Sequence, residues 1–184
     1  VDPRKIELAR YAQYHLQLKP GTNVALLNMM LYFIISEGWE DFNFVNNRTE
    51  GYDELKKEIL ALDIDELETI KGVDKNLVRE ATKAYASANA AMEFHGLGVT
   101  EHSQGTFTVQ LIADLAMITG NIGKKGSGMN PLRGQNNVQG ACDMGGLPNV
   151  YPGYQKVDLP EVQQKMEAAW GVKLSSKVGL PVTK

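Results

Sequence analysis

The sequence has only one cysteine, Cys142, among 184 residues. A single cysteine excludes an internal disulfide framework and a metal site built from clustered cysteines. It fits a reducing compartment, so we expect a cytoplasmic protein. The three histidines are also not spaced four residues apart, as paired metal ligands on a helix are, and we expect no metal ligand in this chain.

Long apolar runs are missing as well. The most apolar stretch covers residues 24–35 and is interrupted by Asn28. This is about a dozen residues, whereas a helix that spans a bilayer needs about 20. The run therefore predicts a buried helix and no membrane contact.

There is no excess of positive charge. Lys and Arg total 19 against 22 for Asp and Glu, which gives a net charge of −3. A nucleic-acid partner is therefore not expected, and any site for an anion must be local.

An initiator methionine and a signal-peptide pattern are also absent. The opening "VDPR" is typical of the last residue of a strand followed by a turn into a helix. We interpret the chain as an internal piece of a longer protein.

The remaining pattern alternates short strands with longer helices. It predicts an α/β fold with a doubly wound, mostly parallel sheet and flanking helices, in which helix outweighs strand. Expected strands cover 15–18 and 89–95. Expected helices cover 5–11, 24–36, 52–62, 65–70, 75–88, 106–120 and 161–171.

Three turns follow predicted strands, where open α/β sheets bind their ligands. Asp2 and Arg4 make the first, and Gly21 with Thr22 makes the second, at the start of a helix. The third follows Gly96 and contains half of a dinucleotide-binding glycine pattern. From the residues alone, ordinary capping or tight turns explain each of them better than a ligand site does.

His102 stands next to Glu101 just after the third turn. The two side chains would suit an acid-base pair, and a polar loop histidine is the alternative. His15 and His95 suggest no chemistry.

The segment 123–146 is harder to explain as scaffold. It shows no helix or strand pattern, and amide side chains gather at 135, 136, 137 and 139. Loops of this length in compact domains are usually functional or disordered, and this one has no charge run. Amides can read the edge of a polar heterocycle, and Arg133 can hold a small carboxylate with two parallel hydrogen bonds.

The stretches "VDPR", "LKPGTNVALLN", "GLGVTEHSQGT", "TGNIGKKGSGMNP" and "NPLRGQNNVQGACDMG" occur in this order. Together they resemble the catalytic subunit of molybdenum or tungsten formate dehydrogenases that carry bis-molybdopterin guanine dinucleotide. The resemblance covers residues 1–157. It implies a partial cofactor-binding α/β domain over 1–157, with a substrate and pterin loop at 123–146, followed by a helix and linker over 158–184.

The resemblance also implies roles for particular residues. The guanosine end of the cofactor would be held by Asp2, Arg4, Leu18, Gly21, Thr22 and Asn23. The pterin would be lined by Leu97, Glu101, Gly134 and Gln135. Arg133 would be the arginine that positions substrate. Many relatives have Asp in place of Asn23 and some have Gln in place of Glu101, which implies altered hydrogen bonding at both positions.

The implied reaction is oxidation of formate to carbon dioxide. The metal ligand and a 4Fe-4S cluster would lie in a missing N-terminal part, so this piece would be inactive alone. Its partners would be the other domains of the subunit and iron-sulfur or other electron-transfer subunits. The alternatives are another molybdopterin oxidoreductase, such as an oxoanion reductase, and a non-catalytic nucleotide-binding or assembly domain.

Overall fold

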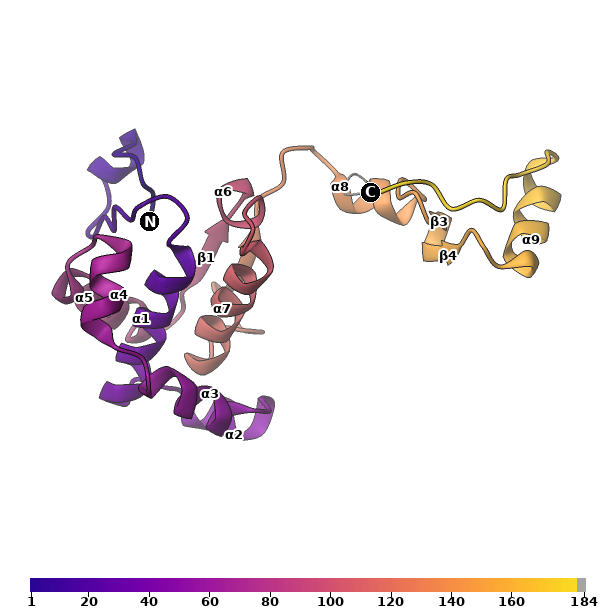
Figure 1. Cartoon of the computed structure of the whole chain (residues 1–184). Coiled ribbons are helices and arrows are strands. Elements are labelled where there is room, and N and C mark those ends of the chain that lie inside the picture. Colours follow the sequence, from indigo (N-terminus) through magenta and orange to yellow (C-terminus); the bar gives the residue numbers. More distant parts are fainter. Residues whose placement is uncertain (182–184) are drawn as a thin grey trace. The chain divides into compact units, whose positions relative to one another are not determined.

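The computed structural model describes residues 1–181 (Figure 1). The chain divides into two compact units, Val1–Leu132 and Arg133–Lys184. In the first unit the elements are η1 (Glu7–Arg10), α1 (Asn23–Glu37), α2 (Phe42–Arg48), α3 (Tyr52–Leu60), α4 (Ile64–Lys71), α5 (Lys75–Ala86), β1 (Met92–His95), α6 (Leu97–Thr100), α7 (Gly105–Ile118) and β2 (Gly128–Pro131). In the second they are α8 (Val138–Asp143), β3 (Val150–Tyr151), η2 (Pro152–Tyr154), β4 (Gln155–Lys156) and α9 (Pro160–Trp170).

Helix α1 is the centre of the first unit and contacts α3, α4, α5 and α7. Its side chains enter two apolar clusters. Leu26 and Met29 belong to one, and Leu31 and Ile34 belong to the other. The expected buried helix is confirmed, because an apolar surface on all sides has to be covered on all sides. Gly38 ends α1 with φ +71°, a conformation that glycine adopts without strain.

Strands β1 and β2 pair in parallel, with Met92 opposite Gly128 and His95 opposite Pro131. Helix α7 lies between them in the sequence and contacts both α1 and β2. The helix-rich α/β class with a small parallel sheet is confirmed. Crossover through a helix is the usual way to join parallel strands.

Two sequence-based expectations were wrong. Segment 123–146 is not free of regular structure, since it contains β2 and α8. The first forms because it can pair with β1, and the second because Asn137 caps it by accepting from the N–H of Gly140 at 2.9 Å.

The expected strand at 15–18 does not form either. Leu16 and Leu18 are buried on either side of the exposed Gln17, which is the alternation that suggested a strand. However, within the described residues a single backbone hydrogen bond joins this segment to its neighbour, from the N–H of Asp2 to the carbonyl of Leu16 at 3.3 Å. One bond does not make a ladder.

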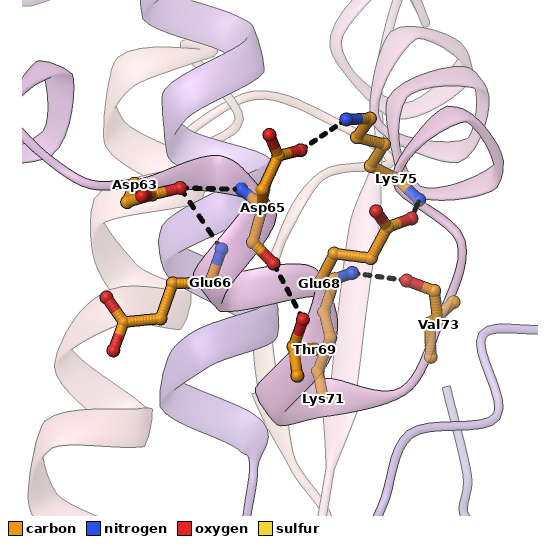
Figure 2. A network of polar contacts seen from close by, with 8 residues as sticks. All are labelled: Asp63, Asp65, Glu66, Glu68, Thr69, Lys71, Val73 and Lys75. Carbon is orange, nitrogen blue, oxygen red and sulfur yellow. Dashed lines mark hydrogen bonds and ion pairs between the residues drawn. The ribbon is translucent and has the colours of Figure 1, made fainter.

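Helices α4 and α5 are joined by a network of polar contacts (Figure 2). Asp63 caps α4, and the carboxylate of Glu68 accepts from the N–H of Lys75 at 2.6 Å, at the start of α5. Lys71 is fully buried and its ammonium donates to the carbonyl of Val73. Burial lowers the pKa of Lys71, opposed by the charges of Glu68 and Asp74. Asp74 caps α5 through the N–H of Leu77, as its place before the helix suggests.

A second polar network lies beside β1. Asn121 is fully buried, accepts from the N–H of Ala91 at 2.9 Å and donates to the hydroxyl of Thr119 at 2.9 Å. Tyr85 donates to one carboxylate oxygen of Glu93, and the other oxygen is buried without a hydrogen bond. The network fixes both the entry to β1 and its second residue.

The second unit is small. Strands β3 and β4 pair antiparallel around η2, and Tyr151, Val157 and Met166 form its apolar cluster. Helix α8 contacts η2. The expected C-terminal helix is confirmed as α9.

Replacing Asn121 with Ala should lower the free energy of unfolding by about 2 kcal/mol, because the N–H of Ala91 loses its buried acceptor. Urea unfolding measures this. The control is Asn136→Ala, at an exposed position, which should stay within about 0.5 kcal/mol of the unaltered chain. Equal effects of the two substitutions would contradict the role given to Asn121.

Glu93→Gln should change how stability depends on pH. Burial raises the pKa of Glu93 above its ordinary value of 4.5, and the hydrogen bond from Tyr85 only partly opposes this. The folded state therefore holds this proton more tightly than the unfolded state does. The resulting stabilisation is complete below pH 4.5 and is lost as the pH rises through the raised value.

The glutamine cannot ionise, so the variant should lack that loss and gain stability relative to the unaltered chain as the pH rises. Urea unfolding at a series of pH values measures the difference. Glu50→Gln, at an exposed position, is the matched control and should reproduce the unaltered profile. Parallel profiles for Glu93→Gln and the unaltered chain would argue against a buried ionising group at β1.

Candidate functional site

The N-terminal turn is held by the carboxylate of Asp2. Its Oδ1 accepts from the N–H of Arg4 at 2.7 Å, which closes the turn. The Arg4 side chain is 82% exposed, and its Nε lies 3.9 Å from the same oxygen. A pair this long and open is weak. The guanidinium of Arg4 is thus available to a ligand.

The same turn is anchored on the extended segment 15–18. His15 Nε2 lies 3.1 Å from the carbonyl oxygen of Asp2, and the amide of Gln17 donates to the carbonyl of Pro3 at 3.0 Å. Leu18, which ends the segment, is buried in the α1 cluster. The structure therefore brings the Asp2 turn beside the segment that leads into α1.

Gly21 begins the next group of expected site residues. It has φ +83°, and nothing lies within 4 Å of where a Cβ would be, so a ligand can approach the backbone. Thr22 is the residue before α1, but its hydroxyl donates to the carbonyl of Lys19 at 2.7 Å instead of capping the helix. The oxygen of Thr22 can still accept a hydrogen bond.

Asn23 is the first residue of α1, and the helix has no side-chain cap and no acidic residue in its first turn. The first N–H groups of a helix have no partner within it and carry partial positive charge. Together with the amide of Asn23, they form a donor-rich surface that suits a polar or anionic group.

The third expected turn follows β1. Gly96 precedes α6, in which Leu97 is 55% exposed. Glu101 is exposed and ends α6, where its N–H donates to the carbonyl of Leu97 at 2.9 Å. In Figure 1, α6 and the start of α1 lie toward the same end of the Val1–Leu132 unit.

Gly105 sets the close approach of α6 to α7. A Cβ at this glycine would lie 2.3 Å from the carbonyl oxygen of Thr100, so the turn needs a residue without a side chain here. Sequence reasoning did not single out Gly105, although a glycine at the first position of a well-formed helix is an unusual choice.

Arg133, Gly134 and Gln135 open the second unit, and all three are exposed. Arg133 makes no ion pair within the part of the chain that the structure describes. An arginine with five free donors is suited to a carboxylate ligand. Cys142, further along in α8, is half-buried and free.

Sequence reasoning also missed the support behind α8. Gly145 has φ +85°, and a Cβ there would lie 2.9 Å from the backbone nitrogen of Pro152, in η2. Tyr154, also in η2, has φ +58°, which is rare for a residue with a side chain. Partial desolvation and a hydrogen bond to Asp143 raise the pKa of Tyr154. The end of α8 is therefore packed tightly on η2.

The expected site residues fall into two sets. Those from Asp2 to Glu101 belong to the unit Val1–Leu132, and those from Arg133 to Gln135 belong to the unit Arg133–Lys184. A common site for both sets stays a prediction. So does the domain boundary after residue 157.

Within residues 1–181, no three His, Cys, Asp or Glu side chains are grouped so that they could hold a metal ion. No helix in the same residues has the length and apolar character that crossing a membrane requires.

The comparisons with known proteins agree on the family. A family model described as molybdopterin oxidoreductase matches residues 1–177. Formate dehydrogenase H of Escherichia coli is 51% identical over 93% of this chain and 24% of its own length. The F420-dependent formate dehydrogenase 1 subunit alpha of Methanococcus maripaludis is 47% identical over 99% of this chain and 27% of its own length.

A solved structure has a similar fold. Acetylene hydratase from Pelobacter acetylenicus matches with a TM-score of 0.64 and 27% identity, over 68% of this chain and 17% of that one. The present chain spans about a quarter of the length of the two curated relatives. It belongs to the molybdopterin oxidoreductase family.

Proposed function

We propose that this chain is part of the catalytic subunit of a formate dehydrogenase, in which it binds molybdopterin guanine dinucleotide and supplies Arg133 to position formate. The observation that carries the proposal is the identity of 51% and 47% to two proteins named as formate dehydrogenases, over almost the whole chain. The exposed, unpaired Arg133 is consistent with it.

The N-terminal end of α1 fits the guanosine end of such a cofactor. Gly21 leaves its backbone open, and Thr22 offers an acceptor oxygen. The second carboxylate oxygen of Asp2, Oδ2, accepts no hydrogen bond within the described residues. Carboxylate and amide groups can pair with the donors of a guanine ring or with ribose hydroxyls. Asp2, Asn23 and the exposed guanidinium of Arg4 would thus hold the nucleoside and its phosphates, with Leu18 packed beneath.

The turn after β1 fits the pterin end. Leu97 would pack its exposed side chain on the flat ring system, and Glu101 would hydrogen bond to its donors. Gly134 and Gln135 would make further pterin contacts from the second unit. The rest of the subunit would contain the metal ligand and would bind the second dinucleotide and a 4Fe-4S cluster.

Arg133 would act on formate directly. Its guanidinium can donate two parallel hydrogen bonds to the two carboxylate oxygens, which fixes the direction of the C–H bond. Its charge would also stabilise the bound anion in a site from which water is excluded. The molybdopterin group, with molybdenum or tungsten bound, would supply the acceptor for the two electrons that formate loses as it gives carbon dioxide and a proton. Electron-transfer subunits would then receive them.

The fold alone does not decide the reaction. Acetylene hydratase, by its name, acts on a different substrate with a similar fold. Reduction of an oxoanion is the principal alternative for this chain, and a non-catalytic nucleotide-binding role is a further one. In both cases the residues at the start of α1 would still bind a nucleotide, but Arg133 would not bind formate.

Arg133→Ala in the full-length enzyme should lower formate-dependent reduction of an artificial dye by about a hundredfold or more, since one preorganised donor group is lost. Metal content should stay the same. Arg133→Lys keeps the charge but loses the planar fork of donors, so its rate of dye reduction should lie between those of the unaltered enzyme and Arg133→Ala. Dye reduction, with metal content determined on the same samples, measures all three.

Arg10→Ala is the matched control, because Arg10 is also exposed and lies in the 3-10 helix η1. It should keep full activity. If the metal-loaded enzyme reduces no dye with formate, the proposed reaction is wrong. If it does so and Arg133→Ala is equally active, the reaction stands and the role of Arg133 is wrong.

A further inference from the structure

The turn that leads into α1 is attached to the junction between α4 and α5, which we define as residues 69–73. The N–H of Lys19 donates to the carbonyl of Lys71 at 2.9 Å. The carbonyl of Lys19 in turn accepts from both the N–H of Thr22, at 3.2 Å, and its hydroxyl, at 2.7 Å. A continuous set of hydrogen bonds therefore runs from the junction, through Lys19, to the residue that precedes α1.

The side chain of Lys19 makes a second attachment. Its ammonium donates to the carbonyl of Thr69 at 3.1 Å, near the C-terminal end of α4, where the helix dipole favours a cation. Its methylene groups lie over Gly72. A Cβ at Gly72 would be 2.7 Å from Cε and 3.2 Å from Cγ of Lys19. Gly72 is thus both the left-handed end of α4, with φ +69°, and the surface on which Lys19 rests.

The junction itself is firmly held. The buried ammonium of Lys71 donates to the carbonyl of Val73 across Gly72, and Glu68 ties the end of α4 to the N–H of Lys75 (Figure 2). Val73 is buried in the same apolar cluster as Leu18, the residue before Lys19. The turn is therefore fastened by apolar packing on one side and by Lys19 on the other.

We infer that Lys19, seated on Gly72, is a positioning residue that holds the turn at 19–22 in the shape that receives a guanine nucleotide. Lys19 acts through the backbone of Thr22 and the start of α1, and it makes no contact with the ligand in this role. The inference rests on the proposed function for the identity of the ligand. The attachment of the turn to the junction stands on the contacts alone.

Gly72→Ala tests the attachment, because the new methyl group would displace the flexible Lys19 side chain and so break its bond to Thr69. Gly38→Ala is the matched control. Gly38 also ends a helix with a positive φ, +71°, and has nothing within 4 Å of its Cβ position, so both substitutions carry the same backbone strain. Lys19→Met removes the ammonium directly, and Lys57→Met, at an exposed position, is its control.

The full-length enzyme is used, and two quantities are measured on each variant. One is the rate of amide hydrogen exchange in peptides that cover residues 18–23. The other is the guanine nucleotide released by acid per polypeptide chain. Gly72→Ala and Lys19→Met should raise the exchange rate about fivefold, the ratio expected for the loss of one hydrogen bond of ordinary strength. They should also lower the nucleotide content, by up to twofold because the second dinucleotide is bound elsewhere in the subunit, whereas the two controls should change neither quantity.

Exchange in Gly72→Ala that equals exchange in Gly38→Ala would overturn the attachment. Faster exchange with full nucleotide content would overturn the positioning role. An unaltered enzyme that releases no guanine nucleotide would overturn the cofactor assignment in the proposed function, and the exchange rates would still decide whether Lys19 fastens the turn.

Discussion

The structure depends on the burial of α1, a helix that is apolar on nearly every side. Its side chains divide the core into two clusters, one toward α4 and α5 and one toward α3 and α7. Because the flanks of α1 are covered, its surface contributes little to binding, and its N-terminal end with the preceding turn is what is left for a ligand. The same burial fixes the direction in which the N–H groups of Asn23 and its neighbours point.

Buried polar groups of the first unit fix the position of β1. A two-stranded parallel sheet has few ladder bonds, so the entry to β1 is fixed by the side chain of Asn121, and Glu93 is held by Tyr85. Gly96 and Leu97 follow directly after the carboxyl end of the strand. Buried polar groups are costly unless they have hydrogen-bond partners. The need for these partners leaves β1 few alternative positions. Within this network, the second carboxylate oxygen of Glu93 is buried without a hydrogen bond.

Local signals in the sequence were enough to find most helices. The apolar run before Gly38 predicted α1, and Asp74 correctly marked the start of α5. Non-local features were out of reach. Strand β2 exists because it pairs with β1, some 36 residues earlier, and its own sequence shows no alternation. Asn137 was read as a group that binds a heterocycle, but its oxygen caps α8. The burial of Lys71 and the seat of Lys19 on Gly72 also follow from tertiary contacts that no local pattern encodes.

Core residues build the fold, whereas exposed residues in the turns could bind a ligand. This difference explains why the family is easier to assign than the reaction. The apolar clusters and caps that build the first unit say only that α1 and β1 are held in place, and acetylene hydratase has a similar fold at 27% identity. Chemistry must be assigned from exposed residues that the fold does not need for itself. Asp2 and Gln17 are partly used by the fold, since their hydrogen bonds hold the N-terminal turn. Arg133 makes no ion pair within the described residues, but the same is true of Arg10, so the missing ion pair does not by itself assign a role. What distinguishes Arg133 is its place in the stretch "NPLRGQNNVQGACDMG", one of those by which the chain resembles formate dehydrogenases, and the proposed reaction therefore depends on Arg133 more than on any residue of the core.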